Sequence, residues 1–430
     1  MTLNRLVPPP IKNAVDFNLE LKKAEIFTLN NGVQVYTINA GEEDVMQLEL
    51  VYAAGNMHET QTLVAAATNS LMKNGTRTKT AFEINEHFEF YGSYLNRGCN
   101  NEIATVSLHT LTKNLGVLLP VMAEMLTEAS FPQEEIDIFT QNSKQRLAVN
   151  LKKCDFVANR LIDAHLYGEE HPYGRYTRTE DFDNLTRDIL VKFYNDYYIH
   201  GRCIIFAAGK LPKNLIEQLN VYFGNLPLQP YKPSAITTQV TPLVKPANRV
   251  QEILNDKDGV QGAIRMARNF PNRHHPDFQK VQVLNNLFGG FFGSRLMSNI
   301  REDKGYTYGI HSYVQNHVEQ SAWMISTEAG RDVCGPTIKE VYSEMEELRE
   351  ELVDEEELLL VKNFMLGSIL GDLDGPFQII NRWKNYVLNG TDDSYFYSSI
   401  HNIKTVTAEE IQALANTWLQ PDYFYELTVI

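Results

Sequence analysis

Apolar and polar positions change from an alternating pattern to a helical one early in the chain. Residues 25–38 and 45–53 alternate or run apolar as strands do, with a turn signal at Asn30, Asn31 and Gly32. Apolar positions then recur with the spacing of amphipathic helices. This spacing predicts helices at residues 62–73, 80–92, 115–128, 133–153 and 155–167.

The second half of the chain repeats this order of elements. Its patterns predict strands near Glu252 and Ile264, a helix at 277–288, a short helix at 294–303, and strands at 306–314 and 322–328. Two long helices then flank Asp354, which with Glu357 has the spacing of a capping box. Thr80 and Glu83 have the same spacing. Runs of strands and runs of helices favour an α+β fold with mostly antiparallel sheets.

Two segments resemble each other and indicate an internal duplication. Residues 185–209 and 406–430 each begin with an apolar residue and a threonine, Thr186 or Thr407, placed to cap a helix. An amphipathic helix, a short turn and an apolar strand follow in each segment. We therefore interpret the chain as two homologous domains, each a mostly antiparallel sheet packed with helices.

A proline-rich stretch separates the two halves. Residues 225–246 contain five prolines and lack helical periodicity. Proline fixes the backbone and removes hydrogen-bond donors, so such a stretch favours an extended linker. We predict a linker at 229–246 between an N-terminal domain at 1–228 and a C-terminal domain at 247–430.

Composition and charge narrow the classes of function. Acidic residues number 54 and basic residues 39, a net charge of −15, which argues against nucleic acid as a partner. No apolar run approaches the roughly 18 residues of a membrane span, so we expect no membrane association. The start of the chain lacks a secretory signal and the four cysteines are far apart, as is typical of reduced thiols. We therefore expect a cytoplasmic protein.

The histidines offer one weak candidate for a metal site. Neither HExxH nor HxxEH, the spacings that place two zinc ligands one helical turn apart, occurs in the sequence. His165, Glu169 and His171 are close in sequence, but Gly168 and Pro172 place them at a helix end and in a loop. A peptidase with a new metal site of this kind remains an open alternative.

Several segments together resemble the pitrilysin/insulinase family of zinc peptidases, in particular its compact members with two similar α+β domains. The segments are LNNGVQVYTI, VYAAGNMHE, HPYGRYTRTEDFDNLT and FQKVQVLNNLFGGFFGSRLMSNIREDKGYTYGIHSYV. The last is the most specific, because it matches the strongest C-terminal signature of the family. The resemblance covers nearly the whole chain.

The resemblance implies that the zinc motif of the family is degenerate here. The family's HxxEH motif precedes a Gly-Thr pair, which in this chain is Gly75 and Thr76. The two histidine positions then fall on Ala66 and Ser70, and the general-base glutamate position falls on Asn69. An alanine methyl and a serine hydroxyl do not bind Zn²⁺ usefully, and asparagine cannot take a proton from water.

The position of the third ligand is also lost. The family places a glutamate on a later helix, where this chain has Gln145 and Arg146. The resemblance therefore implies no zinc and no other cofactor in this chain, and no hydrolysis that depends on a metal-bound hydroxide.

A second family motif is retained. Members supply an arginine and a tyrosine in the pattern R-E-x-x-G-x-x-Y, which here runs from Arg301 to Tyr308. The resemblance implies that the arginine holds a substrate carbonyl and that the tyrosine donates to the oxyanion of a tetrahedral intermediate. Asn96 matches an asparagine that leads into a substrate-binding edge strand, although Arg97 and Cys99 depart from the pattern and a plain loop remains an alternative.

These features lead to one functional hypothesis and one alternative. The chain resembles the zinc-free subunit of a heterodimeric peptidase, inactive by itself, that brings Arg301 and Tyr308 to the zinc of a homologous partner and acts on a peptide substrate. The alternative is an inactive homologue that binds peptide or scaffolds an assembly. A homodimer is one form that this alternative includes.

Overall fold

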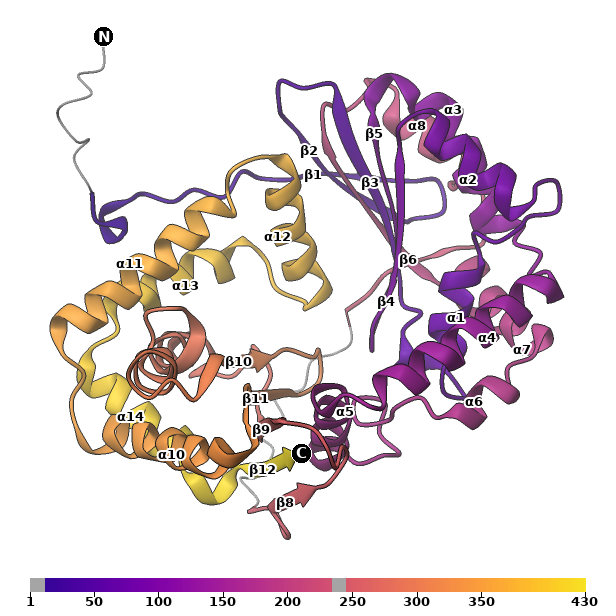
Figure 1. The fold of residues 1–430 in the computed structure, drawn as a ribbon. Helices are drawn as coiled ribbons and strands as arrows, with labels where there is room; N and C mark the ends of the chain where they lie inside the picture. The colour runs from indigo at the N-terminus through magenta and orange to yellow at the C-terminus, as the bar shows by residue number, and fades with distance from the viewer. Residues whose placement is uncertain (1–11, 234–244) are drawn as a thin grey trace, which may run out of the picture.

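The computed structural model describes residues 12–233 and 245–430. Figure 1 shows two lobes side by side, each with a sheet packed against helices. The α+β class predicted from the sequence is confirmed. Of the predicted linker, residues 234–244 lie outside the described part of the chain.

The first sheet has seven strands in the order β1-β2-β6-β3-β5-β4, with β7 added beside β6. The pairs β2–β6 and β6–β7 are parallel and the other pairs are antiparallel. Gly32, at a φ of 88°, makes the predicted turn between the first two strands. The strands are β1 (Glu25–Thr28), β2 (Gln34–Asn39), β3 (Val45–Tyr52), β4 (Tyr94–Cys99), β5 (Ala104–Leu111), β6 (Arg202–Gly209) and β7 (Gln229–Pro230).

The second sheet has five strands in the order β10-β11-β9-β12-β8. Only β12–β8 is parallel. The strands are β8 (Val250–Ile253), β9 (Gln261–Phe270), β10 (Thr307–Gln315), β11 (Ser321–Gly330) and β12 (Tyr425–Val429).

The two sheets share one topology, which confirms the duplication. In the first sheet β6 is parallel to β2 and antiparallel to β3, and in the second β12 is parallel to β8 and antiparallel to β9. Both strands come from the two segments that resemble each other in sequence. A helix precedes each of these strands, and Thr186 or Thr407 caps its N-terminus. The two threonine hydroxyls accept hydrogen bonds from the Ile189 and Glu410 amides.

The predicted helices are confirmed to within a few residues at their ends. The first half holds α1 (Val64–Leu71), α2 (Ala81–Phe90), α3 (Leu115–Thr127), α4 (Gln133–Asn150), α5 (Cys154–Tyr167), α6 (Thr179–Asp183), α7 (Arg187–Tyr194) and α8 (Leu215–Tyr222). The second half holds α9 (Phe278–Asn285), α10 (Cys334–Glu350), α11 (Glu355–Gly371), α12 (Pro376–Leu388), α13 (Asp393–Thr405) and α14 (Ala408–Trp418). The predicted short helix is a π-helical segment at Met297–Asp303.

The predicted capping box at Asp354 and Glu357 is wrong in part. Asp354 does cap α11, because its Oδ1 accepts from the Glu356 amide at 2.7 Å. The Glu357 carboxylate instead accepts two hydrogen bonds of 2.8 Å from Arg295. A two-pronged guanidinium–carboxylate pair is stronger than a hydrogen bond to the backbone at the N-cap, so the long-range contact wins.

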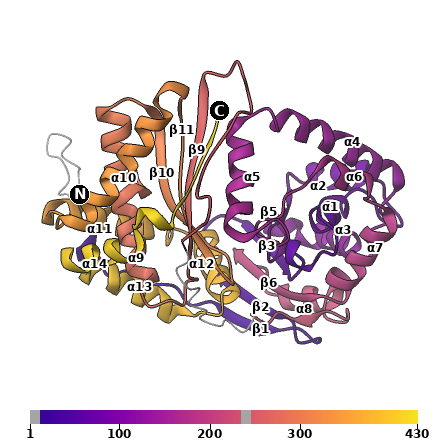
Figure 2. The same ribbon diagram turned by 90° about the horizontal axis from the view of Figure 1, so that it is seen from below.

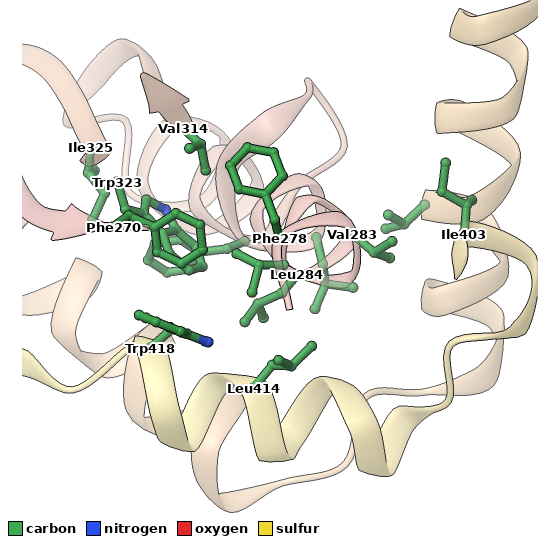
Figure 3. Packing of buried hydrophobic residues seen from close by; sticks show 14 of the residues in the cluster. Phe270, Phe278, Val283, Leu284, Val314, Trp323, Ile325, Ile403, Leu414 and Trp418 are labelled. Carbon is green, nitrogen blue, oxygen red and sulfur yellow. The ribbon is translucent and has the colours of Figure 1, made fainter. Parts of the chain in front are cut away.

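Aromatic and aliphatic side chains pack together in the core of the second lobe (Figure 3). Phe270 on β9 lies between two tryptophans, 4.7 Å from the ring of Trp418 and 5.9 Å from that of Trp323. Leu284 on α9 and Leu414 on α14 belong to the same buried cluster. Burial of this apolar area attaches the helices to the sheet.

Each half also sends a helix to the sheet of the other half. Val157 and Ile162 on α5 pack against Ala267 on β9, and Figure 2 shows α5 beside that sheet. In return α12 packs on β2 and β6, and its Lys384 forms a 2.7 Å ion pair with the buried Glu49 of β3. This exchange joins the two lobes.

Candidate functional site

Arg301 and Tyr308 lie together at the start of β10. Arg301 belongs to the π-helical segment and Tyr308 to the strand that follows, with Gly305 between them at a φ of 65°. This left-handed backbone suits glycine and turns the chain back. As a result the guanidinium carbon of Arg301 lies 5.4 Å from the centre of the Tyr308 ring.

A bulge in the edge strand exposes Tyr308. The register of β10 against β11 shifts between Thr307 and Ile310, so two residues of β10 face one of β11. The hydroxyl of Thr307 holds the bulge by donating to the Glu328 carbonyl oxygen at 2.6 Å. Bulges re-aim side chains at the edges of sheets. The Tyr308 side chain is 92% exposed.

Phe292 is a third residue of this site, and the sequence analysis did not identify it. The Arg301 guanidinium carbon lies 4.5 Å from the centre of the Phe292 ring. The preceding Phe291 stacks on Phe364 of α11, with ring centres 4.5 Å apart, and anchors the loop. The signal in the sequence is the pair of adjacent aromatic residues within GGFFG.

The polar atoms of Arg301 and Tyr308 are available to an external ligand. Within the described residues, the Arg301 side chain has no ion pair and no hydrogen bond, and the Tyr308 hydroxyl has no hydrogen bond. Two aromatic faces hold the guanidinium without using its N–H donors. The arrangement can therefore bind a carbonyl or an oxyanion.

The degenerate zinc positions lie on α1 in the first half. Asn69 is buried, and its Nδ2 donates to the Thr105 carbonyl oxygen at 3.3 Å and to the Tyr198 hydroxyl at 3.2 Å. Ala66 and Ser70 are half-buried on the same helix. Asn69 is thus a packing residue of the core, and the helix provides no ligand for Zn²⁺.

The positively charged side chain of Arg97 lies beside α1. Arg97 on β4 donates from Nη1 to the carbonyl oxygen of Ser70, and burial lowers the pKa of the Arg97 guanidinium. On α4, Arg146 donates to the Ser143 hydroxyl at 3.2 Å. In the described part of the chain, no three His, Cys, Asp or Glu side chains gather in a way that could hold a metal ion. The residues at these positions therefore do not fit zinc.

Asn96 lies on β4, which is a strand at the edge of the first sheet. It pairs with Ser107 of β5 and is exposed. The alternative of a plain loop in this region is therefore wrong. The reason is that residues 94–99 gain a complete antiparallel ladder with β5, a long-range pairing.

His165, Glu169 and His171 do not converge. His165 stacks on Tyr425 with ring centres 5.8 Å apart. Glu169 forms an ion pair with Arg178, and His171 stacks on Tyr167. Each side chain has a separate structural neighbour.

Comparison with known proteins finds similarity to one family of peptidases. A sequence profile described as the peptidase M16 inactive domain matches residues 184–365. The chain is thus related to the M16 peptidases. This confirms the resemblance to the pitrilysin/insulinase peptidases, and the matched segment includes Phe292, Arg301 and Tyr308.

Named relatives are themselves described as uncharacterized zinc proteases. YmxG of Bacillus subtilis is 23% identical over 401 residues, which cover 92% of this chain and 96% of the relative. Rv2782c of Mycobacterium tuberculosis is 21% identical over 401 residues, which cover 92% of this chain and 91% of the relative.

Solved structures share the fold. A peptidase M16 inactive domain from Pseudomonas fluorescens has a TM-score of 0.82 at 22% identity and covers 94% of this chain and 98% of its own. A protease from Helicobacter pylori has a TM-score of 0.81 at 18% identity, covering 95% and 100%. A chain of Complex III2 from Candida albicans has a TM-score of 0.71 at 14% identity, covering 94% and 95%.

Proposed function

We propose that this chain is the zinc-free subunit of a two-subunit M16 metallopeptidase and that Arg301 and Tyr308 complete the active site of a zinc-bearing homologous partner. One observation carries the proposal. Tyr308 is exposed and Arg301 is half-buried, both have unused donors within the described residues, and α1 has no side chain that can bind zinc. A functional pair without a catalytic metal in its own chain requires a second subunit.

The proposed roles follow from the chemistry of the two side chains. The Tyr308 hydroxyl would donate a hydrogen bond to the oxygen of the scissile carbonyl as that oxygen gains negative charge. The Arg301 guanidinium would hold a neighbouring backbone carbonyl of the peptide and so fix the register of the substrate. Both groups would act by positioning the substrate and stabilising charge. Neither would activate the attacking water molecule.

A mixing experiment tests the proposal. This chain and a zinc-bearing M16 homologue from the same genome are purified separately, mixed, and assayed with a library of fluorogenic peptides. We expect cleavage by the mixture, no cleavage by this chain, and zinc in the partner alone by elemental analysis. Full activity of the zinc-bearing homologue without this chain would contradict the proposal, as would stoichiometric zinc in this chain.

A second candidate is an inactive homologue with a scaffolding or peptide-binding role, as a homodimer or within a larger assembly. The similarity in fold to a chain of Complex III2 favours it, because that neighbour belongs to a multi-subunit complex. The Arg301–Tyr308 pair, with its unused donors, supports the first candidate, since a scaffold has no use for an oxyanion donor. Stable self-association with no activity in any mixture would favour the second.

The proposed cellular location is the cytoplasm. All four cysteines lie in the described residues and form no disulfide. Among the described helices, none has both the length and the apolar content needed to cross a bilayer.

A further inference from the structure

The helix α1, which has no side chain suited to zinc, has an arginine side chain beside it. Arg97 reaches from β4 to α1 and donates to the carbonyl oxygen of Ser70, the residue at one of the two degenerate histidine positions. A permanent guanidinium charge beside this helix repels a divalent cation. The same charge attracts an anion.

A second cation, Lys73, follows Ser70 by three residues in the sequence. Lys73 lies two residues after the end of α1 and is half-buried. Burial, followed by the charge of Arg97, lowers the pKa of Lys73, and the carboxylate of Glu89 acts in the opposite direction. Within the described residues neither Arg97 nor Lys73 forms an ion pair.

Most of the donors of these two side chains are unused. A guanidinium has five N–H donors, and the Ser70 carbonyl oxygen takes one from Arg97. The Nε atom of Arg97 is buried and has no hydrogen-bond partner.

We propose that Arg97 and Lys73 form a binding site for a peptide carboxylate at the place where zinc-bearing relatives hold their metal. A carboxylate matches the fork of a guanidinium and gains from a second cation beside it. Arg97 adjoins Asn96 on the edge strand β4, whose outer backbone groups can pair with an added peptide strand. This site lies within one chain and does not depend on a partner subunit.

The test follows the Nε–H signal of Arg97 by ¹⁵N NMR, with the signal assigned through Arg97→Lys. Three probes are titrated at constant ionic strength in chloride: acetate, N-acetylglycine and the uncharged N-acetylglycine amide. We expect a saturable shift with the two carboxylates and none with the amide. Tighter binding of N-acetylglycine would identify a chain-terminal carboxylate, and tighter or equal binding of acetate would identify a side-chain carboxylate.

Paired charge-removal variants make the test specific. Lys73→Met should weaken carboxylate binding at least about tenfold, because one of two cations is lost. Lys113→Met removes the same charge from an exposed position on the same half and should leave binding unchanged. The absence of a saturable shift, or equal effects of the two variants, would overturn the proposal. Circular dichroism establishes that each variant is folded.

Discussion

The ring of Tyr173 stacks on the ring of His317, with 4.1 Å between ring centres and 15° between ring planes. Tyr173 belongs to the loop after α5, and His317 to the turn between β10 and β11. Beside the stack, the Val318 amide donates to Glu102 at 3.1 Å and the Glu319 amide donates to the Tyr173 hydroxyl at 3.4 Å. This contact joins the first half of the chain to the second.

The contact predicts a loss of stability in mild acid. Burial lowers the pKa of His317 below its ordinary value of 6.5; the charge of Glu102 opposes this shift and His171 adds to it. Below pH 6.5 the unfolded chain therefore binds a proton that the folded chain refuses, so stability falls as the pH drops. His317→Phe keeps the stack and should make this fall shallower. Urea unfolding between about pH 7.5 and 5.5 measures it, and equal slopes for both proteins would refute the prediction.

We predict that removing the charge of Asp163 on α5 increases the stability of the folded protein. Burial raises the pKa of Asp163 to about 6, and its Oδ1 has no hydrogen-bond partner. The ordinary pKa of an aspartate is 3.8, so the raised pKa of Asp163 stabilises the folded protein below pH 3.8. This stabilisation is lost as the pH rises through 6. Asp163→Asn should raise the free energy of unfolding by about 2 kcal/mol at pH 8 and change it little at pH 4.

The matched control for this prediction is Asp258→Asn, which removes the same charge from an exposed loop. It should have little effect at either pH. Denaturant unfolding at the two pH values compares the variants. A loss of stability in Asp163→Asn at pH 8 would show that the Asp163 charge has a favourable partner.

Tyr308 predicts a defect in catalysis by the two-subunit enzyme. Tyr308→Phe removes one hydrogen-bond donor from a side chain that is 92% exposed, so the fold should be unaffected. Loss of an oxyanion donor should lower kcat of the mixture by about 10²- to 10³-fold. Tyr397→Phe, an exposed tyrosine on α13, is the control. Steady-state kinetics at fixed partner concentration measures both, and an unchanged kcat would remove Tyr308 from the active site.

Phe292 predicts a smaller effect on substrate binding. Its ring lies under the Arg301 guanidinium and is 60% exposed, so Phe292→Ala should loosen the arginine without unfolding the protein. An exposed cation–π contact is worth about 1 kcal/mol, which corresponds to about a fivefold rise in KM with little change in kcat. Phe292→Tyr keeps the aromatic face and should restore KM. Failure of this rescue would show that Phe292 does not position Arg301.

Local sequence signals determined much of the fold. Thr186 and Thr407 cap their helices through contacts three residues away, and Thr80 with Glu83 forms the expected capping box. Such contacts are written into a few neighbouring residues, so periodicity and capping chemistry predict them. The prediction that α1 holds no zinc also comes from the sequence, through the identities of Ala66 and Asn69 at positions that the family resemblance assigns.

Contacts between distant segments were decided only by the tertiary structure. Glu357 pairs with Arg295 instead of its own helix terminus, and Arg97 reaches the carbonyl of Ser70 from another element. The exchange of α5 and α12 between the lobes and the ring of Phe292 beside Arg301 are of the same kind. Each depends on which surfaces meet once both sheets have formed, and an amphipathic pattern marks the face to be buried without naming its partner.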